Sequence, residues 1–349
     1  LNRGLGAGFF DNEILKVEEA ANEKDSIYWE KIRPIPLTVE EEVDYVRKDS
    51  IKAVRSSKVF LDSLDQVNNR PKVLSFLLGG NYQYSNTYRR QFFTLESPLQ
   101  TFLFNTVQGW NSTLKMRYRK EYDEKNIRYW SAGAKLDYGF SEEALRAKGN
   151  FTYKFNSRNF ARLYIEGGRE LVQFNQLEPI SPIINSFYTL FFRKNFAKYF
   201  ENDFVEVKWR QEVTNGVLLY SYVNVANRRN VFNNSDASFF FEERRTFTPN
   251  NLLINPNALE AGDIADNAAI TFGLNFRLRW KQKYLNYPGQ KFLAGSDLPD
   301  LWLRYRRGIP LNKSSTGFGS SEADYDYLEL QIRENYQSVG LLGYLEYNI

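Results

Sequence analysis

The sequence predicts an all-β fold, a large antiparallel transmembrane β-barrel with a short N-terminal helical segment. Two observations support this prediction. The stretch 270–281 alternates apolar and polar residues over twelve positions, longer than an ordinary strand of about 5 to 6 residues, and this pattern recurs along the chain with charged residues on the polar side. A tilted strand needs about 9 to 11 residues to cross a bilayer, with its apolar side chains toward lipid.

The clearest of these stretches spans residues 270–281. Its even-numbered residues are apolar, whereas its odd-numbered residues are polar or small and end in three basic side chains. Successive side chains of a strand point to opposite faces, so this stretch has one face for lipid and one for water. The apolar face holds Ile270, Phe272, Leu274, Phe276, Leu278 and Trp280, and the other holds Thr271, Gly273, Asn275, Arg277, Arg279 and Lys281.

The same alternation recurs along the chain, in residues 114–119, 147–155, 205–210, 301–306 and 328–333. It predicts roughly ten to twelve strands. A soluble β-sandwich also alternates, but it hides its apolar face in a shared core and seldom places successive Arg or Lys along the other face of such long strands. The pattern therefore favours the membrane barrel over the sandwich.

Composition is compatible with this interpretation. No stretch approaches the roughly eighteen apolar residues of a membrane helix, and the mean hydropathy is −0.53. A barrel turns only every second residue to lipid, so a low mean value does not exclude it. Aromatic residues are frequent β-formers, but they also form interfacial girdles, and several stand near predicted strand ends, namely Trp110, Trp130, Tyr138, Phe140, Trp280 and Tyr284.

The charged and reactive residues exclude several function classes. The 46 basic and 42 acidic residues are nearly balanced, so nucleic acid is not an expected partner. The sequence has no cysteine and no histidine. It therefore offers no disulfide, no thiolate or imidazole metal site, and no Ser-His or Cys-His catalytic pair. We predict no cofactor, no metal and no catalytic residue.

The first part of the chain differs from the rest. We expect residues 1–71 to form an extended and helical periplasmic segment and residues 72–349 to form a partial barrel. Prolines at 34 and 36 predict extended chain, and a helix is predicted from about residue 39 to 64, broken near Asp49 and Ser50. Thr38 and Glu41 fit a capping box at its start. Residues 1–30 lack a signal peptide pattern, and residues 341–348 alternate to the chain end, so we expect a fragment whose closing strands are missing.

Several short motifs together resemble a known group, a Bacteroidota outer-membrane barrel family of unknown function whose members carry a carboxypeptidase-regulatory-like domain near the N-terminus. The resemblance implies an outer-membrane barrel, an N-terminal β-sandwich that precedes this chain, and further strands after it. It implies no biochemical activity and no catalytic residue. Asn230 stands where the family commonly has proline. The motifs are residues 28–30, 33–38, 41, 49–50, 104–110, 227–229, 233–234, 296–299, 301–306 and 324–327.

The candidate site residues are five basic side chains expected to face the lumen, namely Arg277, Arg279, Lys281, Arg304 and Arg306. A row of such groups attracts anions when it is unpaired. The alternative is pairing with carboxylates on comparable faces, for which Glu206, Asp137 and Glu329 are candidates.

Three other groups are interpreted more simply. Residues 242–245 form a charged turn rather than a hydrolase site. Asp263, Asp266, Asp324 and Asp326 lack the spacing of a calcium loop. The glycine-containing stretches 289–295 and 317–319 lack the Lys-Ser or Lys-Thr of a phosphate-binding loop.

We therefore predict a non-enzymatic outer-membrane barrel that acts in transport, in surface assembly or as an interaction platform, with displayed loops such as residues 232–266. Its expected partners are outer-membrane lipid and other envelope proteins. Two alternatives remain open. A soluble, secreted glycan-binding β-sandwich would be soluble without detergent, and a barrel-embedded hydrolase with catalytic residues in the missing part would turn over lipid or ester.

Overall fold

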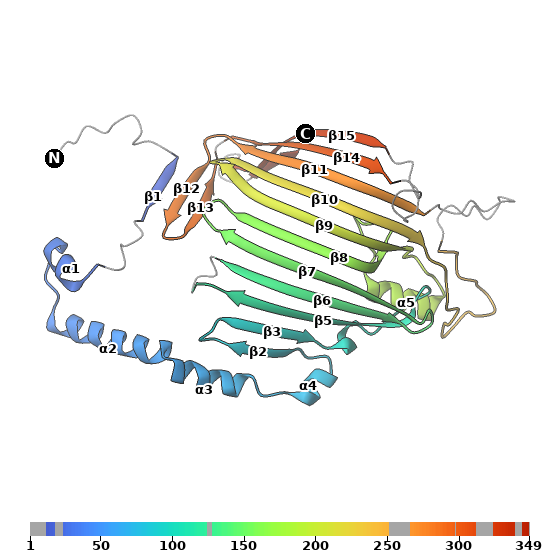
Figure 1. The fold of residues 1–349 in the computed structure, drawn as a ribbon, viewed down its shortest axis with the longest axis horizontal. Coiled ribbons are helices and arrows are strands. Elements are labelled where there is room, and N and C mark those ends of the chain that lie inside the picture. Colours follow the sequence, from blue (N-terminus) through green and yellow to red (C-terminus); the bar gives the residue numbers. More distant parts are fainter. Residues whose placement is uncertain are drawn as a thin grey trace.

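A computed structural model describes residues 12–17, 24–123, 128–250, 266–296, 298–311, 324–338 and 344–348. Its main feature is a 13-stranded sheet in which all neighbours are antiparallel, in the order β16-β15-β14-β11-β10-β9-β8-β7-β6-β5-β3-β2, with β4 also paired to β5 (Figure 1). The all-β prediction is confirmed to this extent. No pairing joins β2 to β16 within the described residues, so this sheet has two edges.

Nine strands of the sheet are long, with 11 to 16 residues each. The alternating stretches 114–119, 147–155, 205–210, 301–306 and 328–333 each lie within one of them, and most strands extend further than the alternation did. The stretch 270–281 instead runs past the end of β11 at Arg279, so that Trp280 and Lys281 lie in the following turn. The long strands are β5 Gly109–Glu121, β6 Tyr129–Gly139, β7 Ala144–Asn156, β8 Ala161–Gln173, β9 Tyr199–Thr214, β10 Val217–Asn230, β11 Asn267–Arg279, β14 Asp300–Pro310 and β15 Tyr325–Ser338.

The remaining strands are short, and sequence alternation did not reveal most of them, so the described strands outnumber the ten to twelve expected. They are β1 Glu13–Lys16, β2 Tyr82–Asn86, β3 Gln91–Glu96, β4 Leu103–Asn105, β12 Lys283–Tyr287, β13 Gln290–Gly295 and β16 Tyr344–Asn348. A second, three-stranded sheet has the order β1-β12-β13, with β1 parallel to β12. Strands β12 and β13 form a hairpin, which follows β11 and lies at the end of the main sheet opposite α5 (Pro182–Phe192) (Figure 1). These two ends are called the hairpin end and the α5 end.

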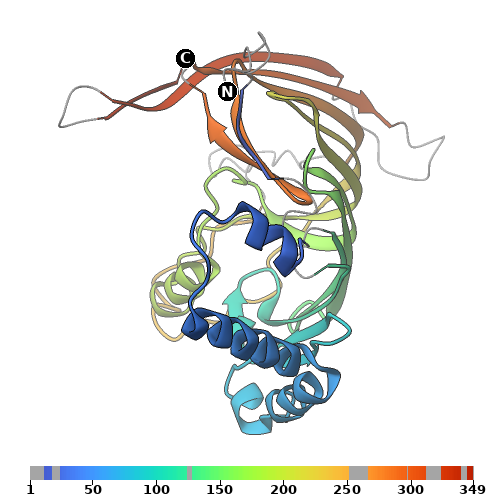
Figure 2. The same ribbon diagram turned by 90° about the vertical axis from the view of Figure 1, so that its left-hand side faces the viewer.

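The main sheet is strongly curved, and the hairpin and the helices lie on its concave side (Figure 2). The polar face of the long strands is the concave one, because Glu212 of that face forms a 2.5 Å ion pair with Lys291 of the hairpin. The opposite, convex face is apolar along the middle of the long strands, whereas charged residues of the same register, such as Arg169, Asp203 and Arg307, lie toward the α5 end. Exposed apolar side chains lie on this face of β8, β9, β10, β14 and β15, namely Ile165, Val205, Val207, Val223, Leu303, Leu328, Leu330 and Ile332.

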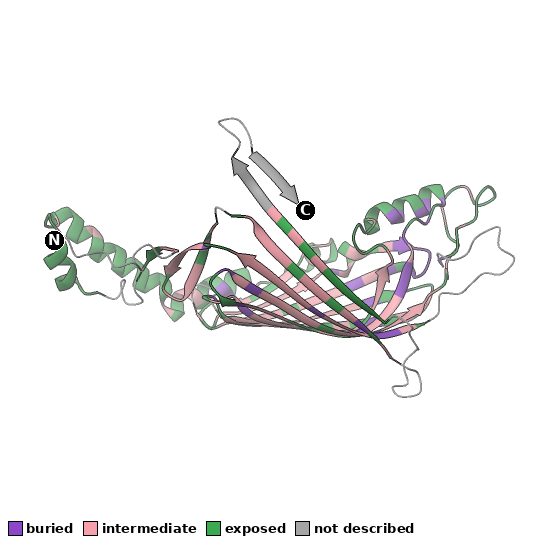
Figure 3. Ribbon diagram, turned by 90° about the horizontal axis from the view of Figure 1, so that it is seen from above, coloured by how far each residue is buried: buried purple, intermediate pink, exposed green. Residues whose placement is uncertain are grey.

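Burial is uneven along the strands. Buried residues gather mainly at the α5 end, where Val107, Ala197 and Tyr199 form a small core (Figure 3). Most other residues of the long strands are intermediate or exposed, although Ala161, Glu212 and Leu218 are buried near the hairpin end. Exposed and half-buried residues alternate along β15 (Figure 3). Within the described residues, no helix is both long and apolar enough to cross a membrane.

The N-terminal helices are α1 Ser26–Ile32, α2 Val39–Ser56, α3 Lys58–Asn68 and α4 Val73–Leu77, and a 3-10 turn spans Pro98–Thr101. The predicted capping box is confirmed, since the Glu41 N–H donates to Thr38 Oγ1 and Glu41 accepts from the Thr38 N–H. The predicted break near Asp49 and Ser50 is wrong. The Ser50 hydroxyl instead donates to the carbonyl of Val46, and Ser50 remains within the helix. The helix is interrupted at Ser57, whose hydroxyl caps the start of α3.

Helix α3 is fastened to the edge strand β2 by two side chains. Asp65, which is 7% exposed, accepts from the N–H of Thr87 at 2.6 Å and from its hydroxyl at 2.7 Å. Asn69 accepts from the N–H of Ser85 and donates to its carbonyl, both at 2.7 Å. An edge strand with unpaired backbone groups invites pairing with other chains. The side chain of Asn69, the C-cap residue of α3, therefore occupies part of this edge.

We predict that Asp65→Ala will loosen α3 from β2, because it leaves the Thr87 N–H without its charged acceptor. The expected cost is about 2 kcal/mol, measured as faster hydrogen exchange of the Thr87 amide. Asp62→Ala is the matched control on the same helix, since Asp62 is half-exposed and forms only a 3.8 Å pair with Lys58. Equal exchange at Thr87 in the two variants would contradict the prediction.

Candidate functional site

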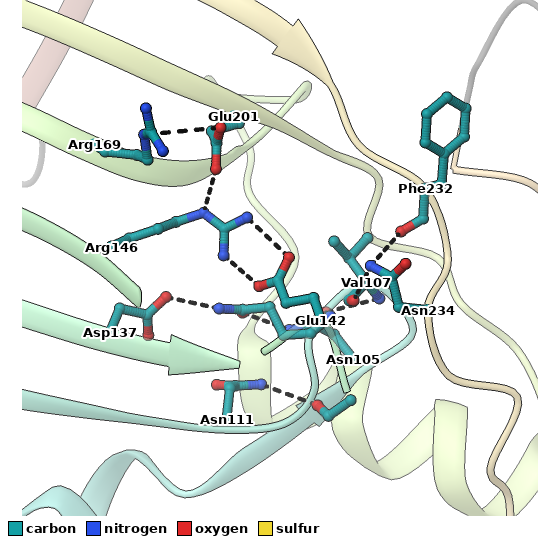
Figure 4. Close-up of polar contacts among 12 residues, drawn as sticks. Asn105, Val107, Asn111, Asp137, Glu142, Arg146, Arg169, Glu201, Phe232 and Asn234 are labelled. Carbon is teal, nitrogen blue, oxygen red and sulfur yellow. Dashed lines mark hydrogen bonds and ion pairs between the residues drawn. The ribbon is translucent and has the colours of Figure 1, made fainter. Parts of the chain in front are cut away.

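The α5 end of the main sheet holds a network of charges around the buried Arg146 (Figure 4). The Arg146 side chain is 2% exposed. Its Nε donates to Glu201 at 2.9 Å, and its Nη2 donates to Glu142 at 2.9 Å. Glu142 lies in the tight turn before β7, and Glu201 lies at the start of β9. Arg146 therefore ties the turn between β6 and β7 to a strand two places away in the sheet.

The network continues across the next strands. Arg229 of β10 contacts Glu201 at 2.8 Å and Asp203 at 2.5 Å, and Arg169 of β8 contacts Asp203 at 2.6 Å. Charges taken out of water are costly unless each is paired. Here carboxylates alternate with guanidinium groups from β7 to β10, so the network braces four strands at one end of the sheet.

A second polar group is built on the turn between β4 and β5. Asp137 accepts from the Gln108 amide and from the Thr113 hydroxyl, both at 2.7 Å. Asn105 receives the N–H groups of Val107 and Gln108 and donates to the Gln108 side chain. This turn is also tight. Gly109 has φ +67°, and a Cβ there would lie 1.8 Å from the hydroxyl oxygen of Ser141.

Two motifs that stand far apart in the sequence meet at this turn. Asn234 donates from its backbone N–H to the carbonyl of Thr106 at 2.8 Å and from its side chain to the carbonyl of Val107 at 2.9 Å (Figure 4). The Thr106 hydroxyl donates to Asn233 at 2.7 Å. The sequence identified residues 104–110 and 233–234 separately, and the structure brings them together as one docking contact.

Helix α5 is locked onto the same turn. The Ser186 hydroxyl accepts from the Phe104 N–H at 3.0 Å and donates to a neighbouring carbonyl. Arg193, in the left-handed conformation at the end of α5, pairs with Asp236 at 2.6 Å. Just before β9, Lys198 donates to Thr248, and burial lowers its pKa to about 8. The segment 231–250 is thereby held against α5.

The five predicted basic residues lie near one another at the β11–β14 side of the sheet, but they do not form one free row. Arg279 makes a two-point pair with Asp300 at 2.6 and 2.5 Å. Arg304 pairs with Glu329 at 3.1 Å. Arg277 and Arg306 lie over aromatic rings, those of Trp302 and Tyr327 respectively. Lys281 stands in the turn after β11.

Of the three carboxylates considered as partners for these residues, Glu329 alone meets one of them in the described part of the chain. Asp137 belongs to the turn described above, and Glu206 contacts Lys208 of its own strand. The missed partner is Asp300. It directly faces Arg279 in the β11–β14 register, which the sequence could reveal only if that register were known.

The structure also locates most of the other groups that the sequence singled out, namely the charged turn, the aspartates and the glycine-containing stretches. Residues 242–244 form an exposed turn. Asp324 and Asp326 both pair with Arg307 at 2.6 Å. No cluster of potential metal ligands occurs among the described residues. The stretch 289–295 lies in the β12–β13 hairpin, whereas Asp263 and residues 317–319 lie outside the described residues.

We predict that Arg146→Met will destabilise the protein by about 3 kcal/mol, because it leaves Glu142 and Glu201 buried without this cation. The measurement is the free energy of unfolding from a urea titration followed by tryptophan fluorescence. Arg169→Met is the matched control. Its side chain is 46% exposed and Arg229 still contacts Asp203, so a loss below about 1 kcal/mol is expected. Equal losses of unfolding free energy in the two variants would show that the burial of Arg146 has no special role.

Comparison with known proteins gives one assignment. The family model described as the C-terminal domain of a family of unknown function, DUF5686, matches residues 74–349. Neither the curated proteins nor the solved structures give a match. The match begins at α4 and covers the main sheet and the hairpin together. The chain therefore belongs to the DUF5686 family, of which residues 74–349 are the C-terminal domain.

Proposed function

We propose that the main sheet is part of the wall of a transmembrane β-barrel in a bacterial outer membrane, and that its concave face lines a passage for polar solutes. The convex apolar face is the observation that carries the proposal. Val205, Val207 and Val223 lie side by side at the centre of the sheet and are 55%, 39% and 42% exposed. Large exposed apolar surfaces of this kind mark contacts with protein or with membrane.

Aromatic side chains at both ends of the convex face support a lipid contact. At the α5 end, Trp110 stacks on Phe102 with ring centroids 5.0 Å apart, and Tyr138 meets Phe140 at 5.1 Å. At the hairpin end, Trp130 contacts Tyr118 and Phe151, and Phe155 contacts Trp209. Such rings suit the two headgroup levels of a bilayer.

The separation of these aromatic groups fits a bilayer. Trp130 and Tyr138 lie at opposite ends of β6, which at about 3.3 Å per residue places them about 26 Å apart along the strand. A tilt of about 40° reduces this to about 20 Å along the membrane normal. Outer-membrane barrels have an apolar band about 25 Å tall. The dimensions are therefore comparable.

The concave face supports a water-filled lumen. Its charges are largely paired across strands, as in Lys148 with Glu166 at 2.7 Å and Arg279 with Asp300. Water and cross-strand partners can both accommodate such groups, whereas lipid cannot. A soluble sandwich is less well supported, because in the described residues no second sheet of comparable size packs against the apolar face.

The connections give the orientation that we propose. The longest connections of the main sheet, residues 174–198 and 231–266, lie at the α5 end, whereas two connections at the hairpin end, residues 215–216 and 157–160, are short. The hairpin end also holds the connection 280–299, which contains the β12–β13 hairpin, and the α5 end also holds the short turn 140–143. Barrels have short periplasmic turns and longer external loops. The α5 end is therefore placed outside the cell. The hairpin end and the N-terminal segment, whose β1 pairs with β12, are placed in the periplasm.

The motifs that resemble the Bacteroidota barrel family support a source in that group and a carboxypeptidase-regulatory-like domain before this chain. Both are proposals. Within the class of non-enzymatic barrels, transport is favoured here over surface assembly or a platform role, because the polar residues line the concave face of the sheet from β3 to β15.

The test is expression of the full-length gene with its native signal. We expect the product to fractionate with the outer membrane and to migrate differently in detergent gels before and after heating. A soluble product whose migration does not change on heating would end the membrane proposal and favour the glycan-binding sandwich.

A pair of variants separates lipid contact from simple exposure. Val223→Arg places a charge on the convex face and should cost about 2 to 4 kcal/mol if that face meets the bilayer centre. The measurement is the free energy of unfolding in phospholipid vesicles. Asn224→Arg, on the concave face of the same strand, is the control and should cost much less. Similar small losses for both would argue that Val223 faces water.

A further inference from the structure

The concave face carries three lysines in one row across neighbouring strands. Lys115 of β5 faces Lys135 of β6, and Lys135 in turn faces Lys148 of β7. Directly opposed side chains have Cβ atoms about 4.5 to 5.5 Å apart, and like charges at this distance are destabilising. The row therefore does not serve the stability of the sheet.

The two outer lysines are compensated and the middle one is not. Lys115 contacts Glu96 at 3.2 Å. Lys148 contacts Glu166 at 2.7 Å and Glu170 at 2.8 Å. These three carboxylates are thus engaged by the outer lysines. Lys135 lies between them, with no carboxylate partner in the described part of the chain.

Arg117 adds a second uncompensated cation. It lies on β5 two residues beyond Lys115, diagonal to Lys135, and it is exposed. No carboxylate contacts it among the residues that the structure describes. Diagonal neighbours of this kind are about 7 to 8 Å apart, a distance that one oxyanion bridges. Arg117, Lys135 and Asn150 line the same cavity of about 330 Å³. The two carboxylates that also line it are those of the ion pairs Lys115–Glu96 and Lys148–Glu166, so Arg117 and Lys135 remain its uncompensated charges.

Gly133 keeps this cavity open. It faces Arg117 on one side and Asn150 on the other. A Cβ at this position would lie 2.9 Å from the side-chain oxygen of Asn150. With glycine there, the Asn150 side chain has room against β6 and lines the same cavity as the two cations. A donor from this amide complements the guanidinium and ammonium groups as a ligand for an oxyanion.

A larger cavity of about 540 Å³ adjoins the first and shares Thr94, Arg117 and Asn150 with it. Its remaining charges, Arg119 and Glu121, pair with each other at 2.9 Å. The other lining groups are mostly hydroxyls and aromatic rings, namely Phe92, Tyr129, Ser131, Thr152 and Tyr164. This surface suits a neutral, hydroxyl-rich body rather than a second charge.

We propose that Lys135 and Arg117 form a binding site for an anionic sugar, in which a phosphate or carboxylate sits between the two cations and the sugar ring lies in the larger cavity. Arg117 supplies paired donors in a fixed geometry, and Lys135 supplies a compact charge. Binding of an anion also relieves the repulsion along the lysine row. The site is formed by one face of one sheet, so it does not depend on the membrane proposal.

The experiment is a calorimetric titration of the purified full-length protein with glucose 6-phosphate, glucuronate, inorganic phosphate and glucose at low salt. We expect the two sugar anions to bind, glucose to show no binding, and inorganic phosphate to bind more weakly than glucose 6-phosphate. The affinity should fall as the salt concentration rises, because the Debye screening length shortens from about 10 Å at 0.1 M to about 3 Å at 1 M. The sugar anion that binds more tightly shows whether the site prefers a phosphate or a carboxylate group.

Four variants test the residues. Lys135→Met and Arg117→Met should each weaken binding about tenfold or more, whereas Lys135→Arg should retain it. Arg306→Met, which removes another concave-face cation that lies over a tyrosine ring, should leave affinity unchanged. Lys135→Met should unfold at an equal or higher urea concentration than the parent, since it removes a repelling charge.

Three results would overturn the proposal. These are glucose binding as tightly as glucose 6-phosphate, wild-type affinity in Lys135→Met and Arg117→Met, or an equal loss of affinity in Arg306→Met. If instead the protein proved soluble and did not shift on heating, the membrane proposal would fail while this titration could still succeed. The two proposals therefore fail separately.

Discussion

Antiparallel pairing from β5 to β15, whose register shifts only near the ends of the β7–β8 and β9–β10 pairings in the described residues, is the constraint on which the other features depend. Every pairing step from β5 to β11, and on through β14 to β15, holds side chains of one parity on the same face. A slip of one residue in any strand would move its charges to the apolar face. The apolar convex face, the paired charges of the concave face and the lysine row all follow from this register.

Two glycines show how closely the register is fixed. Gly168 faces Lys148 with φ +136°, and a Cβ there would lie 2.3 Å from the carbonyl oxygen of Ala147. Gly133 leaves room for the side chain of Asn150 in the middle of β6. The first permits the close approach of two strands next to the Arg146 network, and the second leaves a cavity open. The glycines thus connect sheet geometry to both sites.

The α5 end and the hairpin end are built differently, and this difference bears on function. At the α5 end, buried amides and ion pairs fix a turn, a helix and the segment 231–250 to one another. At the hairpin end, the contact with the main sheet includes Lys291, Glu212 and Gln282. The concave face between these ends is more open, and it is there that the uncompensated Lys135 and Arg117 lie. Rigid ends with an open polar middle suit the passage and binding of polar solutes.

The sequence by itself identified six of the nine long strands, the residues that share a face in each of them, and the start of the long N-terminal helix, because period-two alternation and a capping box are local properties. Only the tertiary structure decided which charges meet. Arg279 meets Asp300, and Lys135 stands between Lys115 and Lys148, because registers across different strands place them there. The break at Ser57 was likewise missed, since both Ser50 and Ser57 can cap or continue a helix. The curvature of the sheet, which makes the polar face concave, is a property of many strands together, so no single stretch of sequence encodes it.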